Sequence, residues 1–171
     1  MKYLFCGGGF CFDYLEEDYE TKAAEDYRAM LLKDTRKLLR GRGTIPLGED
    51  LSYVGPFYFE SDGMADREIV GAEAEQIGRC THAFFLLDGA ACPGTVAEMV
   101  YAASLGKYVS AFYIRDDRET ESMLRSPCWY PMILCGLIAG DRTELIPCRD
   151  PEHARRQILL KAEALAGQDE G

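Results

Sequence analysis

Short apolar runs alternate along the chain with longer segments in which apolar residues recur at helical spacing. Five of the runs have the length of a strand and are bounded mostly by glycine, proline or polar residues. The predicted strands are Lys2–Cys6, Ser52–Phe59, Ala83–Leu87, Tyr108–Ile114 and Glu144–Cys148. Ala83–Leu87 is apolar throughout, which is typical of a central parallel strand covered on both faces. Gly55-Pro56 interrupts Ser52–Phe59, so we expect that strand to bend or end there.

The segments between the predicted strands favour helices. The predicted helices are Tyr19–Leu39, Ala65–Arg79, Thr95–Leu105, Met123–Ile138 and Pro151–Leu165. The cluster Gly41-Arg42-Gly43 closes the first helix and Gly106 stops the third. Pro127 and Pro131 restrict where the fourth helix can begin.

This alternation predicts one α/β domain spanning residues 1–171. The expected architecture is a doubly wound parallel sheet, flavodoxin-like or Rossmann-like, of about five strands with helices on both faces and right-handed crossovers. Ligands of such sheets bind beyond the carboxyl ends of the strands. Three loops are therefore expected to line a site: Gly7–Phe12, Phe59–Asp66 and Asp88–Gly94.

Composition narrows the class of ligand. The net charge of −10 argues against nucleic-acid polymers and anionic membranes, which both need a basic surface, but leaves room for a nucleotide in a local pocket. No apolar run is long enough to cross a bilayer. The seven cysteines form no CxxC pair and only two histidines are present, so we expect a reduced, cytoplasmic protein with no bound metal and no cofactor.

The loop after the run Ala83–Leu87 concentrates the candidate chemistry. Asp88 lies where the strand meets the crevice, and Glu98 lies near the start of the next helix. The field of a helix N-terminus is expected to keep a carboxylate ionised there, and the same place suits ligand oxygens. A structural interpretation comes first on these residues alone, because Thr95-x-x-Glu98 fits a capping box and Asp88 before Gly89 fits a turn.

The sequence around this loop resembles the signature of nucleoside 2-deoxyribosyltransferases and related nucleotide N-glycosidases. Three motifs carry the resemblance: Leu87-Asp88-Gly89, Gly94-Thr95-x-x-Glu98, and Tyr101-Ala102-x-x-x-Gly106-Lys107-Tyr108-Val109. It is strong over Glu73–Val109, looser over Tyr3–Gly9 and Tyr53–Phe59, and does not extend beyond Ile114. It implies a single nucleoside deoxyribosyltransferase-like domain over residues 1–171.

The resemblance implies a catalytic role for three acids. Glu98 is expected to attack the anomeric carbon of the deoxyribose, displace the base and hold the sugar as an ester, with overall retention. Asp88 is expected to hold the sugar or orient Glu98. Glu73 matches an aspartate of the family that contacts the base, although it also fits an exposed acid in the run Glu73-Ala74-Glu75. The leading activity is transfer of 2-deoxyribose between nucleobases.

Cys92 departs from the family pattern. Transferases of the family have an aspartate at this position, whereas the related deoxynucleoside 5′-monophosphate hydrolases have a neutral serine. Cys92 therefore leaves open hydrolysis of (deoxy)nucleoside 5′-monophosphates by the same glutamate. Two further hypotheses stay open. One is a non-catalytic domain that senses a nucleotide, in which Cys92 is an inert thiol. The other is related NAD-glycohydrolase chemistry, in which a glutamate also acts near an anomeric carbon.

Substrate contacts are expected from small residues around these loops and from one aromatic side chain. The predicted substrate-binding residues are Gly7, Gly9, Phe10, Gly89, Cys92, Gly94 and Thr95. Glycines permit close approach of backbone to ligand, and Phe10 can stack on a base or pack in the core. The expected partner is a small nucleoside or nucleotide. The resemblance also implies a homo-oligomer, in which the aromatic segment Ser126–Met132 serves as an interface.

Overall fold

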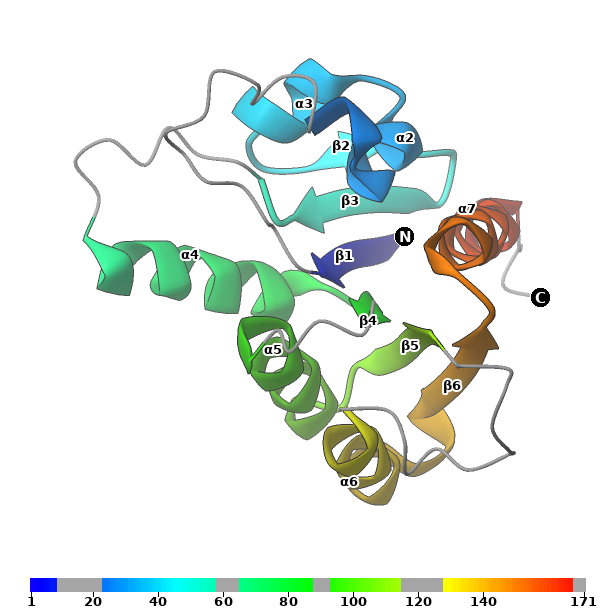
Figure 1. Ribbon diagram of the computed structural model, residues 1–171. Coiled ribbons are helices and arrows are strands. Elements are labelled where there is room, and N and C mark those ends of the chain that lie inside the picture. Colours follow the sequence, from blue (N-terminus) through cyan, green and yellow to red (C-terminus); the bar gives the residue numbers. More distant parts are fainter. Residues whose placement is uncertain (9–22, 58–64, 88–92, 115–127, 168–171) are drawn as a thin grey trace.

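The computed structural model describes residues 1–8, 23–57, 65–87, 93–114 and 128–167 (Figure 1). Within these ranges, six strands form one sheet in the order β2-β3-β1-β4-β5-β6. Five of them run parallel: β1 (Lys2–Gly8), β3 (Leu51–Gly55), β4 (His82–Leu87), β5 (Tyr108–Ile114) and β6 (Thr143–Cys148). The two-residue β2 (Ile45–Pro46) pairs antiparallel with β3 at the edge of the sheet.

The five parallel strands confirm the predicted architecture, and the sixth strand corrects the count. β2 has no alternating pattern and contains Pro46, so nothing in its sequence marks it as a strand. It forms only because Ile45 and Pro46 lie opposite Tyr53 and Ser52, and proline is tolerated at an edge. β3 ends at Gly55, as the Gly55-Pro56 interruption predicted.

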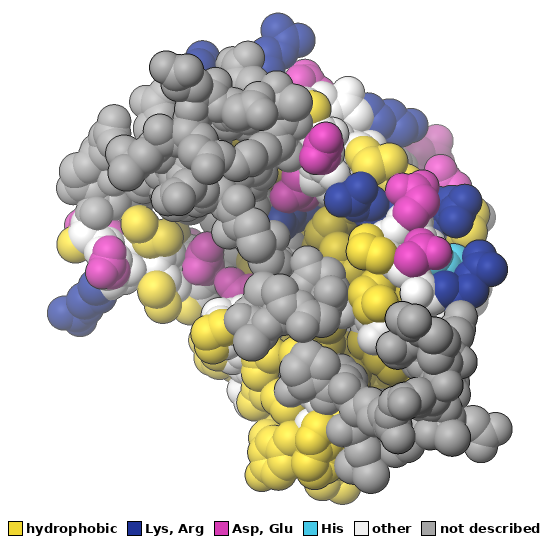
Figure 2. Space-filling model, viewed as in Figure 1, with side chains coloured by type: hydrophobic (Ala, Val, Ile, Leu, Met, Phe, Trp, Pro, Cys, Tyr) yellow, Lys and Arg dark blue, Asp and Glu magenta, His cyan; other side chains and the backbone are white. Residues whose placement is uncertain are grey.

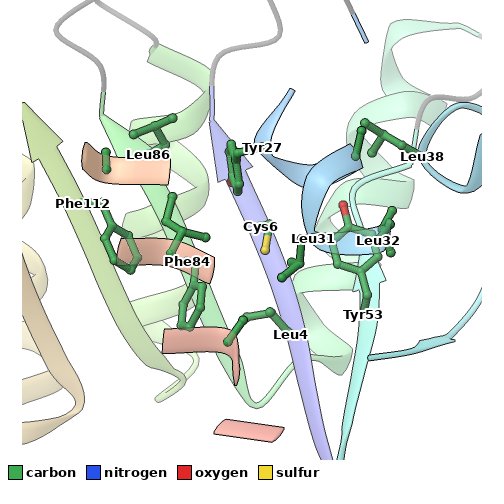
Figure 3. Packing of buried hydrophobic residues seen from close by; sticks show 14 of the residues in the cluster. Leu4, Cys6, Tyr27, Leu31, Leu32, Leu38, Tyr53, Phe84, Leu86 and Phe112 are labelled. Atoms are coloured by element: carbon green, nitrogen blue, oxygen red, sulfur yellow. The ribbon is translucent and has the colours of Figure 1, made fainter. Parts of the chain in front are cut away.

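Helices cover both faces of the sheet (Figure 1). One face carries α2 (Tyr27–Leu32), α3 (Thr35–Arg40) and α7 (Pro151–Gly167), and the other carries α4 (Asp66–Arg79), α5 (Pro93–Ser104) and α6 (Trp129–Ala139), which a single 3-10 turn (Gly140–Arg142) follows. Alternate residues of the central strands supply the two cores. Phe84 and Leu86 point to the face that carries α2 and α7, as Figure 3 shows, whereas Phe85 and Leu87 belong to the core on the side of α5.

The first predicted helix is wrong as a single element. In place of Tyr19–Leu39 the chain forms α2 and α3, separated at Lys33, which adopts a left-handed conformation with φ 55°. Asp34 accounts for the break, because its side chain accepts the backbone N–H of Arg36 and starts a new helix. Residues 19–22 lie outside the described ranges.

The other helices agree with prediction apart from their ends. α4 and α7 begin within one residue of the predicted starts. α5 begins at Pro93 rather than Thr95, which places Thr95 inside its first turn. α6 spans Trp129–Ala139, and the earlier part of Met123–Ile138 lies outside the described residues. None of the described helices is long and apolar enough to cross a membrane.

The topology brings three strand ends together at the centre of the sheet. β1 lies between β3 and β4, so the three predicted loops leave from neighbouring strands. β1 pairs with β3 only as far as Phe5 opposite Gly55, but continues beside β4 to Gly8 opposite Leu86. Among the described strands, none pairs with the last residues of β1 on the β3 side, so other groups must satisfy the carbonyls that face that way.

Candidate active site

Glu98 projects from the start of α5 against the end of β1. Its Oε2 atom lies 3.1 Å from the position that a β-carbon on Gly7 would occupy. The ring of Phe85 lies still closer, with Cδ1 only 2.4 Å from the same position. A side chain at residue 7 would therefore collide with Phe85 and crowd the carboxylate. Glu98 therefore packs against Gly7, which the sequence predicted to contact substrate.

Glu73 supplies a second carboxyl group from α4. Both Glu73 and Glu98 are half-buried in the described structure. Burial raises the pKa of Glu98 to about 7, the negative charge of Glu73 adds to this rise, and the positive charge of Arg28 opposes it. Burial also raises the pKa of Glu73, and Arg28 again opposes the rise. The fold thus brings the two predicted acids into electrostatic contact.

The position of Glu98 near the start of α5 led us to expect an ionised carboxylate. Because its pKa is raised to about 7, the carboxyl is instead mostly protonated below that pH. Partial removal from water and the neighbouring Glu73 outweigh the favourable field of the α5 N-terminus. Two interacting carboxyls release their protons in steps that belong to the pair rather than to either residue. The raised pKa of Glu98 therefore places the loss of the last proton from the pair near neutral pH, with burial as the larger cause.

Thr95 is buried within the first turn of α5, whereas a capping box requires it at the N-cap. The capping interpretation of Thr95-x-x-Glu98 is therefore wrong, because the helix already starts at Pro93. Gly94 is exposed, and among the described residues nothing beyond its chain neighbours and its own helix backbone lies within 4 Å of where its β-carbon would be. Contacts of Gly94 and Thr95 with substrate remain predictions.

The other predicted site residues cannot be placed. Gly9, Phe10, Asp88, Gly89 and Cys92 all lie outside the described ranges. Their proposed roles remain predictions that the resemblance implies. Among the residues that the structure describes, no group of three or more His, Cys, Asp or Glu side chains could hold a metal ion.

Sequence reasoning missed a buried cation behind the site. Arg28 is only 1% exposed, and Asp26 binds it through two bonds, from Nε to Oδ1 at 2.9 Å and from Nη2 to Oδ2 at 2.8 Å. Its Nη1 also donates to the carbonyl of Cys6 at 3.3 Å. An arginine within a polar, helical stretch is usually solvent-exposed, so its sequence carried no sign of this burial.

Comparison with known proteins identifies the fold. No protein-family model matches the sequence, and no curated protein matches it either. The CMP N-glycosidase BcmB of Clostridium botulinum shares the fold with a TM-score of 0.52 and 13% identity, over 94% of this chain and 99% of that chain. Elongation factor SelB of Methanococcus maripaludis, solved with a GTP analogue, aligns with a TM-score of 0.51 and 10% identity, over 99% of this chain and 34% of that chain.

At these identities the likeness is one of fold. A mixed α/β domain with a mostly parallel sheet is shared, and the BcmB likeness extends over nearly the whole of both chains. The family resemblance seen in the sequence therefore has a loose structural counterpart. SelB shows how widely such sheets are used, because only about a third of that chain aligns.

The raised pKa of Glu98 predicts that this residue destabilises the fold at alkaline pH. When a carboxyl has a higher pKa in the folded than in the unfolded protein, the folded state loses stability as the pH rises from about 4.5 through about 7. We expect Glu98→Gln to raise the free energy of unfolding by about 1–3 kcal/mol at pH 8 and to leave it nearly unchanged near pH 4. Urea unfolding at both pH values measures the difference. The exposed Glu75→Gln on α4 is the control, and an equal gain at both pH values contradicts the prediction.

Proposed function

We propose that the protein cleaves the N-glycosidic bond of a (deoxy)nucleoside or its 5′-phosphate, with Glu98 as the nucleophile. The observation that carries the proposal is the position of Glu98, half-buried against Gly7 at the carboxyl end of a central strand, with Glu73 as a second carboxyl. Ligands of doubly wound sheets bind at such strand ends. The fold shared with a CMP N-glycosidase supports this reaction class.

The reaction needs two carboxyl groups in different protonation states. The Glu98 carboxylate attacks C1′ of the sugar, the C1′–N bond breaks, and Glu73 donates its proton to the ring nitrogen of the departing base. The sugar then remains on Glu98 as an ester. Water or a second base attacks C1′ from the opposite side, returns a proton to Glu73 and releases Glu98, so configuration is retained overall.

The proton shared by the pair fits this scheme. With a pKa of about 7, Glu98 carries a proton in part of the free protein at neutral pH, and this is the proton that the departing base must receive. Reaction therefore requires the proton to move from Glu98 to Glu73 when substrate binds. The reactive form has Glu73 protonated and Glu98 ionised, which is the less populated of the two ways to place one proton on the pair.

Two reactions share this first step. Transfer of 2-deoxyribose to another base is our first proposal, because the sequence motifs resemble those of transferases. Hydrolysis of a nucleoside 5′-monophosphate is the second, and the CMP N-glycosidase neighbour favours it. The ester on Glu98 is common to both, so the acceptor alone separates them.

Two incubations test the function and separate these reactions. The protein is incubated with deoxyadenosine plus free cytosine, and separately with CMP, dCMP and other deoxynucleoside monophosphates, and products are resolved by chromatography. Deoxycytidine in the first supports transfer, whereas free base plus sugar phosphate in the second supports hydrolysis. Binding without cleavage of any of these compounds overturns the proposal in favour of a nucleotide-sensing domain.

We propose further that the protein forms a homo-oligomer through α6. This helix contains no charged residue and presents five exposed large apolar side chains: Trp129, Tyr130, Ile133, Leu137 and Ile138. Figure 2 shows the apolar surface gathered at the end of the molecule where α6 lies. Such a patch is unusual on a monomer. Two copies that each carry a charge of −10 repel one another least across an uncharged face.

Leu137→Asp tests the oligomer. Leu137 is 79% exposed, so the change should leave the fold intact while placing a charge in the proposed interface. We expect the variant to sediment as a monomer at concentrations where the wild type is larger. Leu160→Asp, at a 58% exposed position on α7, is the control and should behave like the wild type. A wild type that sediments as a monomer at about 50 µM, a concentration well above the Kd of stable dimers, contradicts the proposal.

The cysteines support a reducing location. Each of the five described cysteines is a buried free thiol: Cys6, Cys80, Cys128, Cys135 and Cys148. Free thiols persist where glutathione and thioredoxin keep them reduced. We propose on this ground that the protein works in the cytoplasm.

A further inference from the structure

The start of α2 is bound to the end of β1 by two consecutive side chains. Tyr27 Oη donates to the carbonyl of Gly7 at 2.8 Å, and Arg28 Nη1 donates to the carbonyl of Cys6 at 3.3 Å. In Figure 3 the Tyr27 side chain lies beside the end of β1, next to Cys6. These carbonyls belong to the stretch of β1 that extends beyond its pairing with β3. Tyr27 and Arg28 therefore bind the backbone of β1 where β3 no longer pairs with it.

Asp26 fixes the second of these side chains. Its Oδ1 accepts the backbone N–H of Arg28 at 2.7 Å, which caps α2, while its two oxygens also bind the Arg28 guanidinium. Both partners are buried, with side-chain exposures of 1% for Arg28 and 7% for Asp26. Burial alone lowers the pKa of Arg28, but Asp26 raises it above its ordinary value, so the guanidinium stays charged.

The next helix shows that capping does not require burial. Asp34 caps α3 in the same way, accepting the backbone N–H of Arg36 at 2.9 Å, and Arg36 Nε lies 3.4 Å from the same oxygen. This second pair is on the surface, with Arg36 88% exposed. A surface pair of this kind contributes little to stability, whereas burying the first pair costs desolvation energy. The buried arrangement at Asp26 and Arg28 calls for a reason beyond the helix cap.

The reason lies on the other side of Gly7. Glu98 Oε2 lies 3.1 Å from where a β-carbon on Gly7 would be, and Tyr27 binds the carbonyl of the same residue. The charged groups that act on Glu98 among the described residues are Glu73 from α4 and Arg28 from α2. Arg28 is thus the cation that opposes the combined effect of burial and Glu73. A fixed positive charge behind the strand end favours the carboxylate form of the nucleophile.

We propose that Asp26, Tyr27 and Arg28 are positioning residues of the N-glycosidic reaction, which fix the end of β1 against Glu98 and stabilise Glu98 as the attacking carboxylate. The inference rests on the proposed function. None of the three needs to touch substrate, because Tyr27 and Arg28 act through the Cys6 and Gly7 backbone and through charge. The loss of either the hydroxyl or the cation should therefore change catalysis more than substrate binding.

The test compares two matched pairs of substitutions. The double variant Asp26→Asn with Arg28→Met removes both charges, because removing one alone would leave a buried unpaired charge and risk unfolding. The double variant Asp34→Asn with Arg36→Met is its surface counterpart. We expect the first to lower kcat of base release at neutral pH about tenfold or more, with a smaller change in KM, and to move the pH profile to higher pH. The second should match the wild type.

Tyr27→Phe separates the hydrogen bond from the charge. It should lower kcat while leaving the pH profile where it is in the wild type. A profile that does not move in the Asp26 and Arg28 double variant, or a loss of kcat that its surface counterpart shares, overturns the proposal.

Titration of the Glu98 carboxyl tests this inference independently of the proposed function. Glutamate labelled with 13C at the side-chain carboxyl gives a Glu98 signal that Glu98→Gln removes, and its midpoint is read by NMR. The midpoint should rise in the Asp26 and Arg28 double variant and stay in place in the surface counterpart. A wild type that releases no base overturns the proposed function and the catalytic part of this inference. An unmoved midpoint overturns the coupling of Arg28 to Glu98 whether or not base is released.

Discussion

Glu98→Gln is expected to lower kcat for base release by about 10³-fold or more while the Kd for substrate stays within about threefold. Glutamine keeps the shape of the side chain against Gly7 but cannot form the sugar ester. The loss should appear equally with nucleosides and nucleotides, because the first step is common to transfer and hydrolysis. Base release is followed by chromatography, and substrate binding to the variant by calorimetry.

Glu75→Gln provides the matched control for this experiment. Glu75 is an exposed acid on α4, in the same acidic run as Glu73, and its replacement should leave kcat unchanged. The sugar ester itself offers a direct check, since a 2-fluoro sugar slows its breakdown and lets mass spectrometry detect the adduct on the peptide that contains Glu98. Retention of more than about a tenth of wild-type kcat by Glu98→Gln assigns the chemistry elsewhere.

Glu73→Gln is expected to lower kcat by about 10²-fold or more on ordinary substrates, because the departing base loses its proton donor. The wild-type profile should be bell-shaped, since the pair must hold one proton, with the alkaline limb near pH 7. In the variant the alkaline limb should disappear. The single rising limb that remains reports Glu98 alone and should lie below about pH 7, because the charge of Glu73 is one cause of the raised pKa of Glu98.

A substrate whose base leaves without a proton distinguishes an acid from a merely structural residue. A 7-methylated purine nucleoside carries its positive charge already, so Glu73→Gln should process it nearly as well as the wild type does. Equal losses on methylated and ordinary substrates would show that Glu73 supports the fold or binding rather than proton transfer. A bell-shaped profile in the variant would assign the alkaline limb to another group.

The sequence alone was sufficient for the parallel sheet but not for the finer elements. Apolar runs such as Ala83–Leu87 predict buried strands because a strand covered on both faces needs apolar residues at every position. β2 escaped prediction because an edge pair of two residues depends on what lies opposite it. The break between α2 and α3 was missed because apolar periodicity continues across Lys33, although Asp34 is a recognisable N-cap.

The sequence predicted those site residues that follow the end of a strand or match a family motif. Glu98 and Glu73 are far apart in sequence, and only the family resemblance associated them. The structure adds the means of their contact, which is the packing of α4 beside α5 near β1. Arg28 was missed for a physical reason: burial of an ion pair depends on long-range packing, which no local pattern of residues records.

The environment of Gly7 sets how far this site can be altered. The Phe85 ring occupies the space that a side chain at residue 7 would need, and Glu98 borders that space. A library of substitutions at this position should therefore yield active protein only with glycine. Gly8 differs, because a β-carbon there would meet the described side chains around it at 3.4 Å or more, an ordinary contact distance. Of two adjacent glycines, therefore, one is obligatory and the other is replaceable. Engineering of the substrate range can begin at the second without disturbing the carboxylate.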